Sequence, residues 1–289
     1  MTRRAWVLFI LSSVIWGVPY LFIKIAVDAG IAPAFVAWSR IALAAALLLP
    51  LAIRRKVLQG LRDRTAAIIG YTACEVAVPF ILISIGEQYI TSSLTAILVA
   101  TMPLMVALLS LRLMPGEHLS GKRLIGLLIG FAGVVALLGF DVAGRGTELL
   151  GAALVLVATL GYAIAPIIVS KRLADLDPLG PVTASLLVAT LALLPAAIIT
   201  FPHQMPATSA LVAIAVLGVI CTAAGLVIFF RLIAEAGPSR ASVITYVNPL
   251  IAVVVGVVAL GERLSLVSVF GLGLILVGSW VSTGGSHGA

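Results

Sequence analysis

Ten long apolar segments follow one another along this 289-residue chain, and their length constrains its fold more than any other feature. At about 1.5 Å of rise per residue, a helix of about 20 residues crosses the roughly 30 Å hydrocarbon core of a bilayer. Transmembrane β-strands would instead alternate polar and apolar residues. The sequence therefore predicts an all-α integral membrane protein whose ten transmembrane helices span residues 5–27, 33–53, 65–85, 90–112, 121–140, 148–170, 178–201, 208–232, 237–260 and 266–282.

The composition agrees with this prediction. Hydrophobic residues make up 62% of the chain, charged residues only 10%, and the mean hydropathy is +1.24, which leaves too few polar side chains to cover a globular surface. A net charge of +7 would suggest nucleic acid as a partner of a soluble protein. Here the basic residues lie between the apolar segments, where membrane topology explains them better. We expect a surrounding lipid bilayer and no nucleic-acid partner.

A stretch of the first half of the chain recurs in the second half. Pro103 inside an apolar segment is followed by the turn 116–120, which reads Gly-Glu-His-Leu-Ser. Pro249 in a later segment is followed by the turn 261–265, which reads Gly-Glu-Arg-Leu-Ser. Matched positions of this kind indicate duplication. The sequence thus predicts two repeats of five helices, residues 1–141 and 142–289.

Lysine and arginine are distributed unequally between the two sides of the predicted bundle. Of the 18 basic residues, Lys24 and Arg40 lie within helices, and Arg145 and Arg263 lie in loops on one side. All the others lie at the side that holds both termini, so both termini are predicted to be cytoplasmic. Because five is an odd number, the second repeat enters the membrane from the opposite side. Inverted repeats of this kind commonly build transporters.

Several sequence pieces, in this order and spacing, resemble a known family. They are Trp16-Gly17 with Lys24, Pro33 to Arg40, Pro103 followed by Gly116-Glu117, Leu217-Gly218 to Thr222, Gly237 to Ser242, and Pro249 with Gly261-Glu262-Arg263-Leu264 and the Gly271/Gly278 helix. Together they resemble the ten-helix EamA-type branch of the drug/metabolite transporter superfamily, and within it the amino-acid exporters of the YddG type.

The resemblance implies export or exchange of small metabolites, amino acids among them, across the bacterial inner membrane. It also implies a central cavity lined chiefly by helices 1, 3, 4, 6, 8 and 9. One position departs from the pattern, because Asn248 stands before Pro249 where many relatives have an acidic residue.

Motifs for enzymatic chemistry in a membrane are missing. The sequence contains neither an HExxH zinc motif nor a Walker A motif. His118, His203 and His287 fall in predicted loops or in the tail, whereas a metal site needs several ligands brought together. We therefore expect no enzymatic activity, no catalytic residue, no metal, no cofactor and no ATP hydrolysis by this chain.

Lys24, Arg40 and Glu75 are charged residues inside the predicted apolar segments, away from the basic side. A charge at the bilayer centre costs about 2.5–3.5 kcal/mol on insertion scales, so such residues face the protein interior or a hydrated cavity. Lys24 lies near a helix end, where it can snorkel and pair with Asp28 one turn on. For Arg40 and Glu75 two interpretations stay open, a cavity or gate and a buried structural pair. Glu75 aligns with uncharged Thr222 in the second repeat.

Proline occurs within several predicted helices, among them Pro79, Pro103 and Pro249. A proline frees the carbonyl one turn earlier, which can bind substrate or water, although a tolerated kink is the alternative. Thr101 and Asn248 flank two of these prolines and can add side-chain hydrogen bonds.

Aromatic side chains within or near the helix interiors would suit a mostly apolar pocket, with ordinary packing as the alternative. They are Trp16, Tyr20, Trp38, Tyr71, Tyr162 and Tyr246. Small-residue faces at Gly126, Gly130 and Gly133 and at Gly271 and Gly278 allow close helix contact, either within a monomer or between monomers.

The sequence as a whole predicts a secondary transporter that moves a small-molecule substrate, an amino acid or a related metabolite, by alternating access. We expect a monomer or a weak dimer. The alternative is a non-transporting membrane receptor or scaffold protein.

Overall fold

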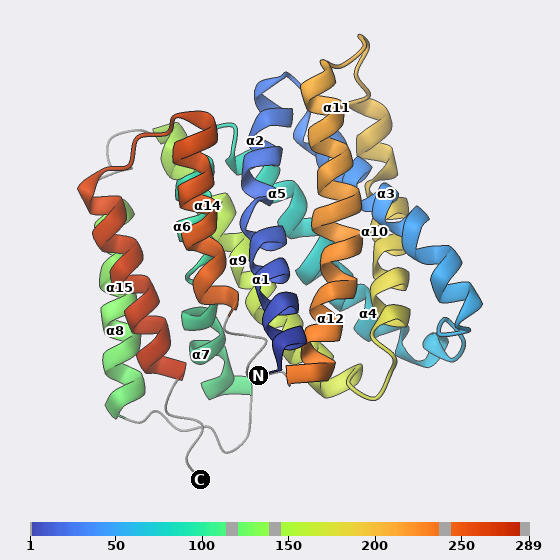
Figure 1. Cartoon of the computed structure of the whole chain (residues 1–289), viewed down its shortest axis with the longest axis horizontal. Coiled ribbons are helices and arrows are strands. Elements are labelled where there is room, and N and C mark those ends of the chain that lie inside the picture. Colours follow the sequence, from blue (N-terminus) through green and yellow to red (C-terminus); the bar gives the residue numbers. More distant parts are fainter. Residues whose placement is uncertain (1, 114–120, 139–145, 237–243, 284–289) are drawn as a thin grey trace.

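The computed structural model describes residues 2–113, 121–138, 146–236 and 244–283, and their regular structure is entirely helical (Figure 1). The first half of the chain contains α1 (Arg3–Gly17), α2 (Pro19–Asp28), α3 (Pro33–Arg54), η1 (Leu61–Arg64), α4 (Thr65–Tyr71), η2 (Thr72–Ala77), α5 (Val78–Gly86), α6 (Ser92–Val99), α7 (Met102–Leu113) and α8 (Gly121–Ala136). The second half contains α9 (Gly146–Arg172), α10 (Leu179–Ile199), α11 (Thr208–Ala215), η4 (Val216–Ala224), α12 (Gly225–Ala236), α14 (Ile244–Leu260) and α15 (Leu266–Thr283).

These elements form ten membrane segments, which confirms the all-α, ten-helix prediction. Four segments are composite, because α1 continues into α2, α4 into η2 and α5, α6 into α7, and α11 into η4 and α12. Seven segments are long and apolar enough to span a bilayer, while α8, α14 and α15 are shorter apolar helices. The predicted turn 116–120 and residues 237–243 of the predicted ninth helix lie outside the described residues.

Breaks in the helices have local causes. Pro19 and Pro103 each lack an amide N–H and stand in the first turn of a new helix, where that donor has no partner in any case. Two π-helices, η2 and η4, interrupt the third and eighth segments at the aligned positions of the two halves. η2 contains Glu75 and η4 contains Thr222. Short π-helical segments inside α-helices occur frequently at functional sites.

Glycine brings α8 and α15 together along their length (Figure 1). A Cβ added to Gly126 would lie 2.4 Å from the backbone nitrogen of Ser282, and one added to Gly278 would lie 2.3 Å from that of Gly130. The small-residue faces therefore pack within the monomer, which is one of the two interpretations left open by the sequence.

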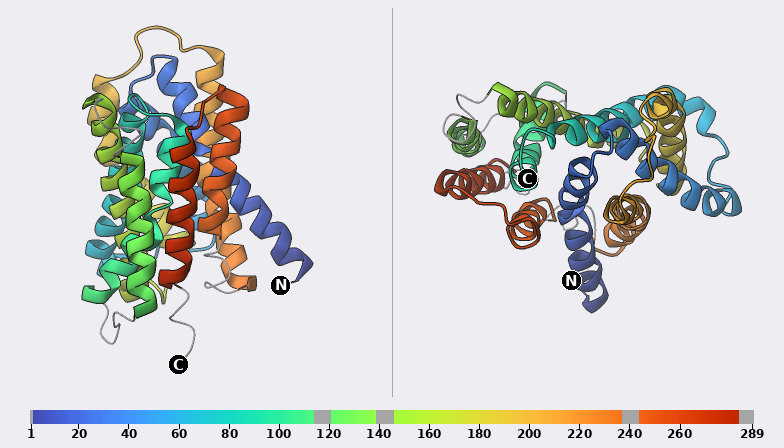
Figure 2. Two further views of the ribbon diagram at one scale, coloured as in Figure 1. Left: turned by 90° about the vertical axis from the view of Figure 1, so that its left-hand side faces the viewer. Right: turned by 90° about the horizontal axis from the view of Figure 1, so that it is seen from above.

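The bundle has two unlike ends. Figure 1 places the start of α1 and the end of α15 at its lower end, which we call the termini end, and Figure 2 shows the same arrangement from the side. At the opposite, distal end, α2 ends and α3, α6 and α11 begin. A buried apolar cluster, which we call the distal cluster, fills this end with side chains from α2, α3, α5, α9, α11 and η4.

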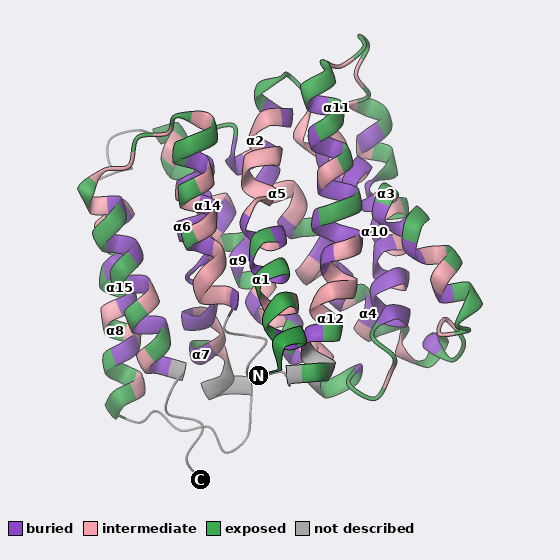
Figure 3. Cartoon of the chain, in the orientation of Figure 1, coloured by how far each residue is buried: buried purple, intermediate pink, exposed green. Residues whose placement is uncertain are grey.

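The outer faces of the bundle carry large exposed apolar side chains. Figure 3 colours all exposed residues of the ribbon green. Phe131 on α8, Leu191 and Ile198 on α10, and Phe270 on α15 are each more than half exposed. A soluble monomer rarely exposes so much contiguous apolar surface, whereas lipid chains cover it in a membrane.

Candidate substrate cavity

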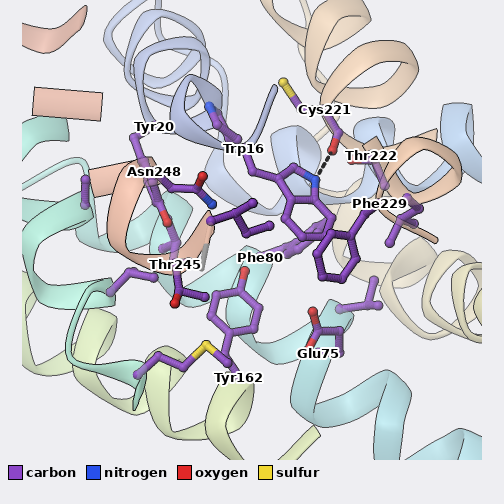
Figure 4. A pocket seen from close by; sticks show the side chains of 18 of the residues that line it. Trp16, Tyr20, Glu75, Phe80, Tyr162, Cys221, Thr222, Phe229, Thr245 and Asn248 are labelled. Carbon is purple, nitrogen blue, oxygen red and sulfur yellow. Dashed lines mark hydrogen bonds between the residues drawn. The ribbon is translucent and has the colours of Figure 1, made fainter. Parts of the chain in front are cut away.

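A cavity of about 440 Å³ lies between helices of both halves of the chain. This size is within the range of small-molecule sites, about 300–1,000 Å³. All six helices expected to line it contribute side chains, and α3 and α10 contribute as well. Figure 4 shows that side chains from α1, α5, α9, η4, α12 and α14 converge on it.

The structure brings ten of the residues singled out from the sequence into the cavity wall. They are Trp16, Tyr20, Arg40, Tyr71, Glu75, Pro103, Tyr162, Thr222, Asn248 and Pro249.

The other five predicted site residues do not line the cavity. Trp38 donates its indole N–H to the Thr190 carbonyl of α10 at 3.0 Å. Thr101 bonds back to the Leu98 carbonyl at 2.6 Å, and Pro79 packs toward Gly161 of α9. Lys24 lies at the distal end, and Tyr246 on α14 lies outside the wall.

Arg40 is the buried cation of the cavity. Its side chain is only 5% exposed, and its Nε and Nη2 atoms donate to the Thr222 hydroxyl at 3.3 and 3.2 Å. Its guanidinium carbon lies 4.0 Å from the centre of the Phe80 ring, a cation–π contact. Thr222 in turn donates to the Leu217 carbonyl at 2.8 Å, a bond over five residues that the π-helix η4 makes possible. Contacts from η4 and α5 thus fix the position of the guanidinium.

Glu75 is the acidic counterpart, in the wall of the same cavity on η2. Among the described residues, ion pairs join Arg4 to Glu235, Lys24 to Asp28, and Arg64 to Asp175. Glu75 and Arg40 therefore make no direct ion pair, although both face the cavity. Of the two interpretations that the sequence left open, this arrangement favours a cavity role.

Aromatic rings and backbone contacts complete the wall. The rings of Trp16 and Phe229 lie 4.6 Å apart between centroids, and the indole N–H of Trp16 donates to the Cys221 carbonyl of η4 at 3.1 Å (Figure 4). With its amide nitrogen turned toward acceptors, Asn248 donates to the Ile244 carbonyl at 2.9 Å and to the Ser13 carbonyl at 3.2 Å. This neutral amide therefore joins α14 to α1.

Sequence reasoning missed several wall residues, including Phe80, Phe229 and Thr245. Position along an apolar helix gives the depth of a residue in the membrane, but where all faces are apolar it does not give the face that points inward. For Thr245 the sequence offered a partial signal, because it stands beside Tyr246 and three residues before Asn248, which had been singled out.

Sequence reasoning also missed Glu87, directly after α5. Its side chain is fully buried, and neither carboxyl oxygen has a hydrogen-bond partner among the described residues. Lys24 donates to the backbone carbonyl of Glu87 at 2.8 Å and pairs with Asp28 at 3.0 Å. The pairing of Lys24 with Asp28 agrees with the interpretation of Lys24 as a snorkelling residue.

Known proteins resemble this chain along almost its whole length. The model of the EamA-like transporter family matches residues 3–139 and again residues 149–284. An uncharacterized transporter of Archaeoglobus fulgidus is 25% identical over 278 residues, which cover 96% of this chain and 98% of that protein. The uncharacterized inner membrane transporter YedA of Escherichia coli K12 is 29% identical over 270 residues, 91% of this chain and 85% of YedA.

A crystal structure shares the fold. It superposes with a TM-score of 0.69 at 19% sequence identity and covers 98% of both chains. The two family matches coincide with the two halves that carry the matched prolines, π-helices and glycine faces. This membrane protein therefore belongs to the EamA-like transporter family.

Proposed function

We propose that this membrane transporter exports or exchanges small organic solutes, with amino acids as the favoured class, by alternating access through the central cavity. It acts as a secondary transporter in a bacterial inner membrane, as the name of its relative, the inner membrane transporter YedA, suggests by analogy. Both termini are cytoplasmic in this proposal, so the distal end faces the periplasm.

The observation that carries the amino-acid assignment is the chemistry of the cavity wall. Arg40 and Glu75 supply one cationic and one acidic group in a wall that is otherwise mostly apolar and aromatic. They are not paired with each other, so a zwitterion can present its carboxylate to the guanidinium and its ammonium to the carboxylate. Charge-assisted hydrogen bonds of this kind are about twice as strong as neutral ones. Aromatic neighbours such as Trp16 and Phe229 would then contact an apolar side chain.

The closed distal end supports alternating access. Ile23 and Ile83 line the cavity and also belong to the distal cluster, so this buried cluster borders the cavity directly at the distal end. Inverted repeats can exchange conformations, and the exchange would open this end and close the other.

Transport in proteoliposomes tests the proposal. We expect counterflow of at least one amino acid, and weaker competition from analogues that lack either the ammonium or the carboxylate. Expression should also confer resistance to a toxic amino-acid analogue by lowering its internal concentration. Absence of counterflow with every amino acid and common metabolite would instead support the receptor or scaffold alternative. If analogues that lack the ammonium or the carboxylate competed as strongly as the intact amino acid, the assignment of a zwitterionic substrate would be wrong.

A further inference from the structure

Glu87 is a buried carboxyl at the distal end of the cavity, and the proposed transport cycle gives it no role. It follows the last residue of α5 and lies one helical turn beyond Ile83, which lines the cavity. Its side chain is 0% exposed, and both carboxyl oxygens lack a hydrogen-bond partner among the described residues. A carboxylate buried in this way is strongly disfavoured, so the side chain is neutral in this conformation.

The charged and titratable groups around Glu87 leave it without a counter-ion. On α2, Lys24 lies 3.0 Å from Asp28 and bonds to the backbone of Glu87, not to its carboxyl. The carboxylate of Glu262, before α15, accepts bonds from the first residues of α6. The further groups that interact electrostatically with Glu87 are Arg40 on α3 and Tyr20 on α2.

Burial raises the pKa of the Glu87 carboxyl well above its usual range. Lys24 and Arg40 oppose this shift, whereas Glu262 and Asp28 add to it. Glu87 lies just beyond the apolar segment that ends at Gly86, at the end where solvent would enter if the distal cluster separated.

We infer that Glu87 is a proton-binding site of the distal gate, where closing takes up one proton from water at that end and opening releases it. The inference rests on the proposed alternating-access function. When the gate opens, water solvates the carboxyl, which returns toward the ordinary glutamate pKa of about 4.3 and ionises. The closed state binds the extra proton, so lowering the pH favours closure and raising the pH favours opening.

The coupling operates over a defined pH window. It begins near the ordinary pKa of about 4.3 and extends up to the raised value of the closed state. Within this window, linkage of one proton changes the ratio of closed to open protein about tenfold per pH unit. Because the distal end faces the periplasm in the proposed orientation, periplasmic acidity would hold the gate closed.

Thiol labelling in the distal cluster measures the gate without any substrate. Ala26 on α2 is fully buried in that cluster and does not line the cavity. In purified full-length protein whose Cys74 and Cys221 are replaced, Ala26→Cys reacts with a small water-soluble thiol reagent only when the distal gate opens. Comparing this protein with its Glu87→Gln variant at each pH cancels the titration of the thiol itself.

As the pH is raised within the window, we expect the labelling rate of the protein with Glu87 to rise by up to about tenfold per pH unit relative to the Glu87→Gln variant. Glu148→Gln removes another carboxyl at the same end and should leave the profile unchanged. If Glu87→Gln fails to insert, Glu87→Met supplies a neutral side chain of similar length. Parallel pH profiles for the protein with and without Glu87 would overturn the inference. If no amino acid gave counterflow but the pH profile of labelling still depended on Glu87, the proposed substrate would be wrong and the proton-binding site would still be supported.

Discussion

At the residue scale, the two charged groups of the cavity are held differently. Arg40 contacts Thr222 of η4 and Phe80 of α5, so its guanidinium joins three segments as well as facing the cavity. Glu75 is only partly buried and makes no ion pair among the described residues. In the proposed site the acidic group is therefore open to a ligand, whereas the basic group both joins the helices and would contact the substrate.

Glu75→Gln should weaken transport without weakening the fold. The amide keeps the shape of the side chain but loses the charge that would bind an ammonium, and a hydrogen bond to a charged group contributes about 1.5–3 kcal/mol. We expect about a tenfold or greater loss of apparent substrate affinity in counterflow assays and an unchanged melting temperature in detergent. Wild-type affinity in this variant would show that Glu75 does not bind the substrate.

Arg40→Ala should reduce both transport and stability. It removes the cation–π contact with Phe80 and leaves the Thr222 hydroxyl without its two donors, in addition to emptying space in the core. Thermal unfolding of the purified protein should show a lower melting temperature for Arg40→Ala than for Glu75→Gln. The reverse order would contradict the structural role of Arg40.

What the sequence revealed about single residues was their depth in the membrane. Depth identified Arg40 and Glu75, because a charge deep in an apolar helix must face a cavity or a partner. Depth misplaced Trp38 and Pro79, which lie at suitable heights but face α10 and α9. Glu87 was missed because a carboxyl at a helix end resembles an ordinary solvated residue, and only its tertiary surroundings bury it.

At the element scale, the length of the apolar segments predicted the helices, and the matched prolines and turns predicted the repeat, but the partners of the glycine faces and the π-helices could not be predicted. The position of a π-turn depends on where the neighbouring helices accommodate an extra residue, and the pattern of apolar residues does not indicate that position. In η2 and η4 the π-turn places Glu75 and Thr222 in the cavity wall.

Gly278→Ala should destabilise the α8–α15 pair. The added Cβ would meet backbone atoms of Gly130 and Gly126 at 2.3–2.6 Å, and backbone cannot move aside as a flexible side chain can. Overpacking of this kind costs about 1–3 kcal/mol. The matched control is Gly273→Ala on the same helix, where no atom lies within 4 Å of the added Cβ. Equal melting temperatures for the two variants would show that the close contact is not required.

Glu262→Ala should loosen the distal end of α6. The Glu262 carboxylate accepts from the backbone N–H groups of Ser92 and Ser93 at 2.8 and 2.9 Å, and also from both serine hydroxyls. Loss of a capping carboxylate typically costs about 0.5–2 kcal/mol. Hydrogen exchange of the first turn of α6 should therefore accelerate, whereas the exposed neighbour change Arg263→Ala should leave it unaltered. Unchanged exchange after Glu262→Ala would contradict the capping role.

At the scale of the whole molecule, the described helices fall into two groups on either side of α1 and α2. Figure 1 shows α6, α7, α8, α14 and α15 on one side and α3, α4, α10, α11 and α12 on the other. The cavity lies where these groups meet, and α2 packs against members of both, α6 and α14 on one side and α11 on the other. Opening the distal end would therefore separate α2 from at least one group.

The orientation in the membrane determines which compartment each end serves, and cysteine accessibility tests it. Ala32 precedes α3 and Ala207 precedes α11, so both lie at the distal end, while Gln59 lies in the connection after α3 at the other end. The excess of lysine and arginine at the termini end predicts that this end is cytoplasmic. After replacement of Cys74 and Cys221, Ala32→Cys and Ala207→Cys should react with an impermeant thiol reagent in intact cells, and Gln59→Cys should react only after the membrane is permeabilised. The opposite pattern would reverse the orientation, and the proton taken up at Glu87 would then come from the cytoplasm.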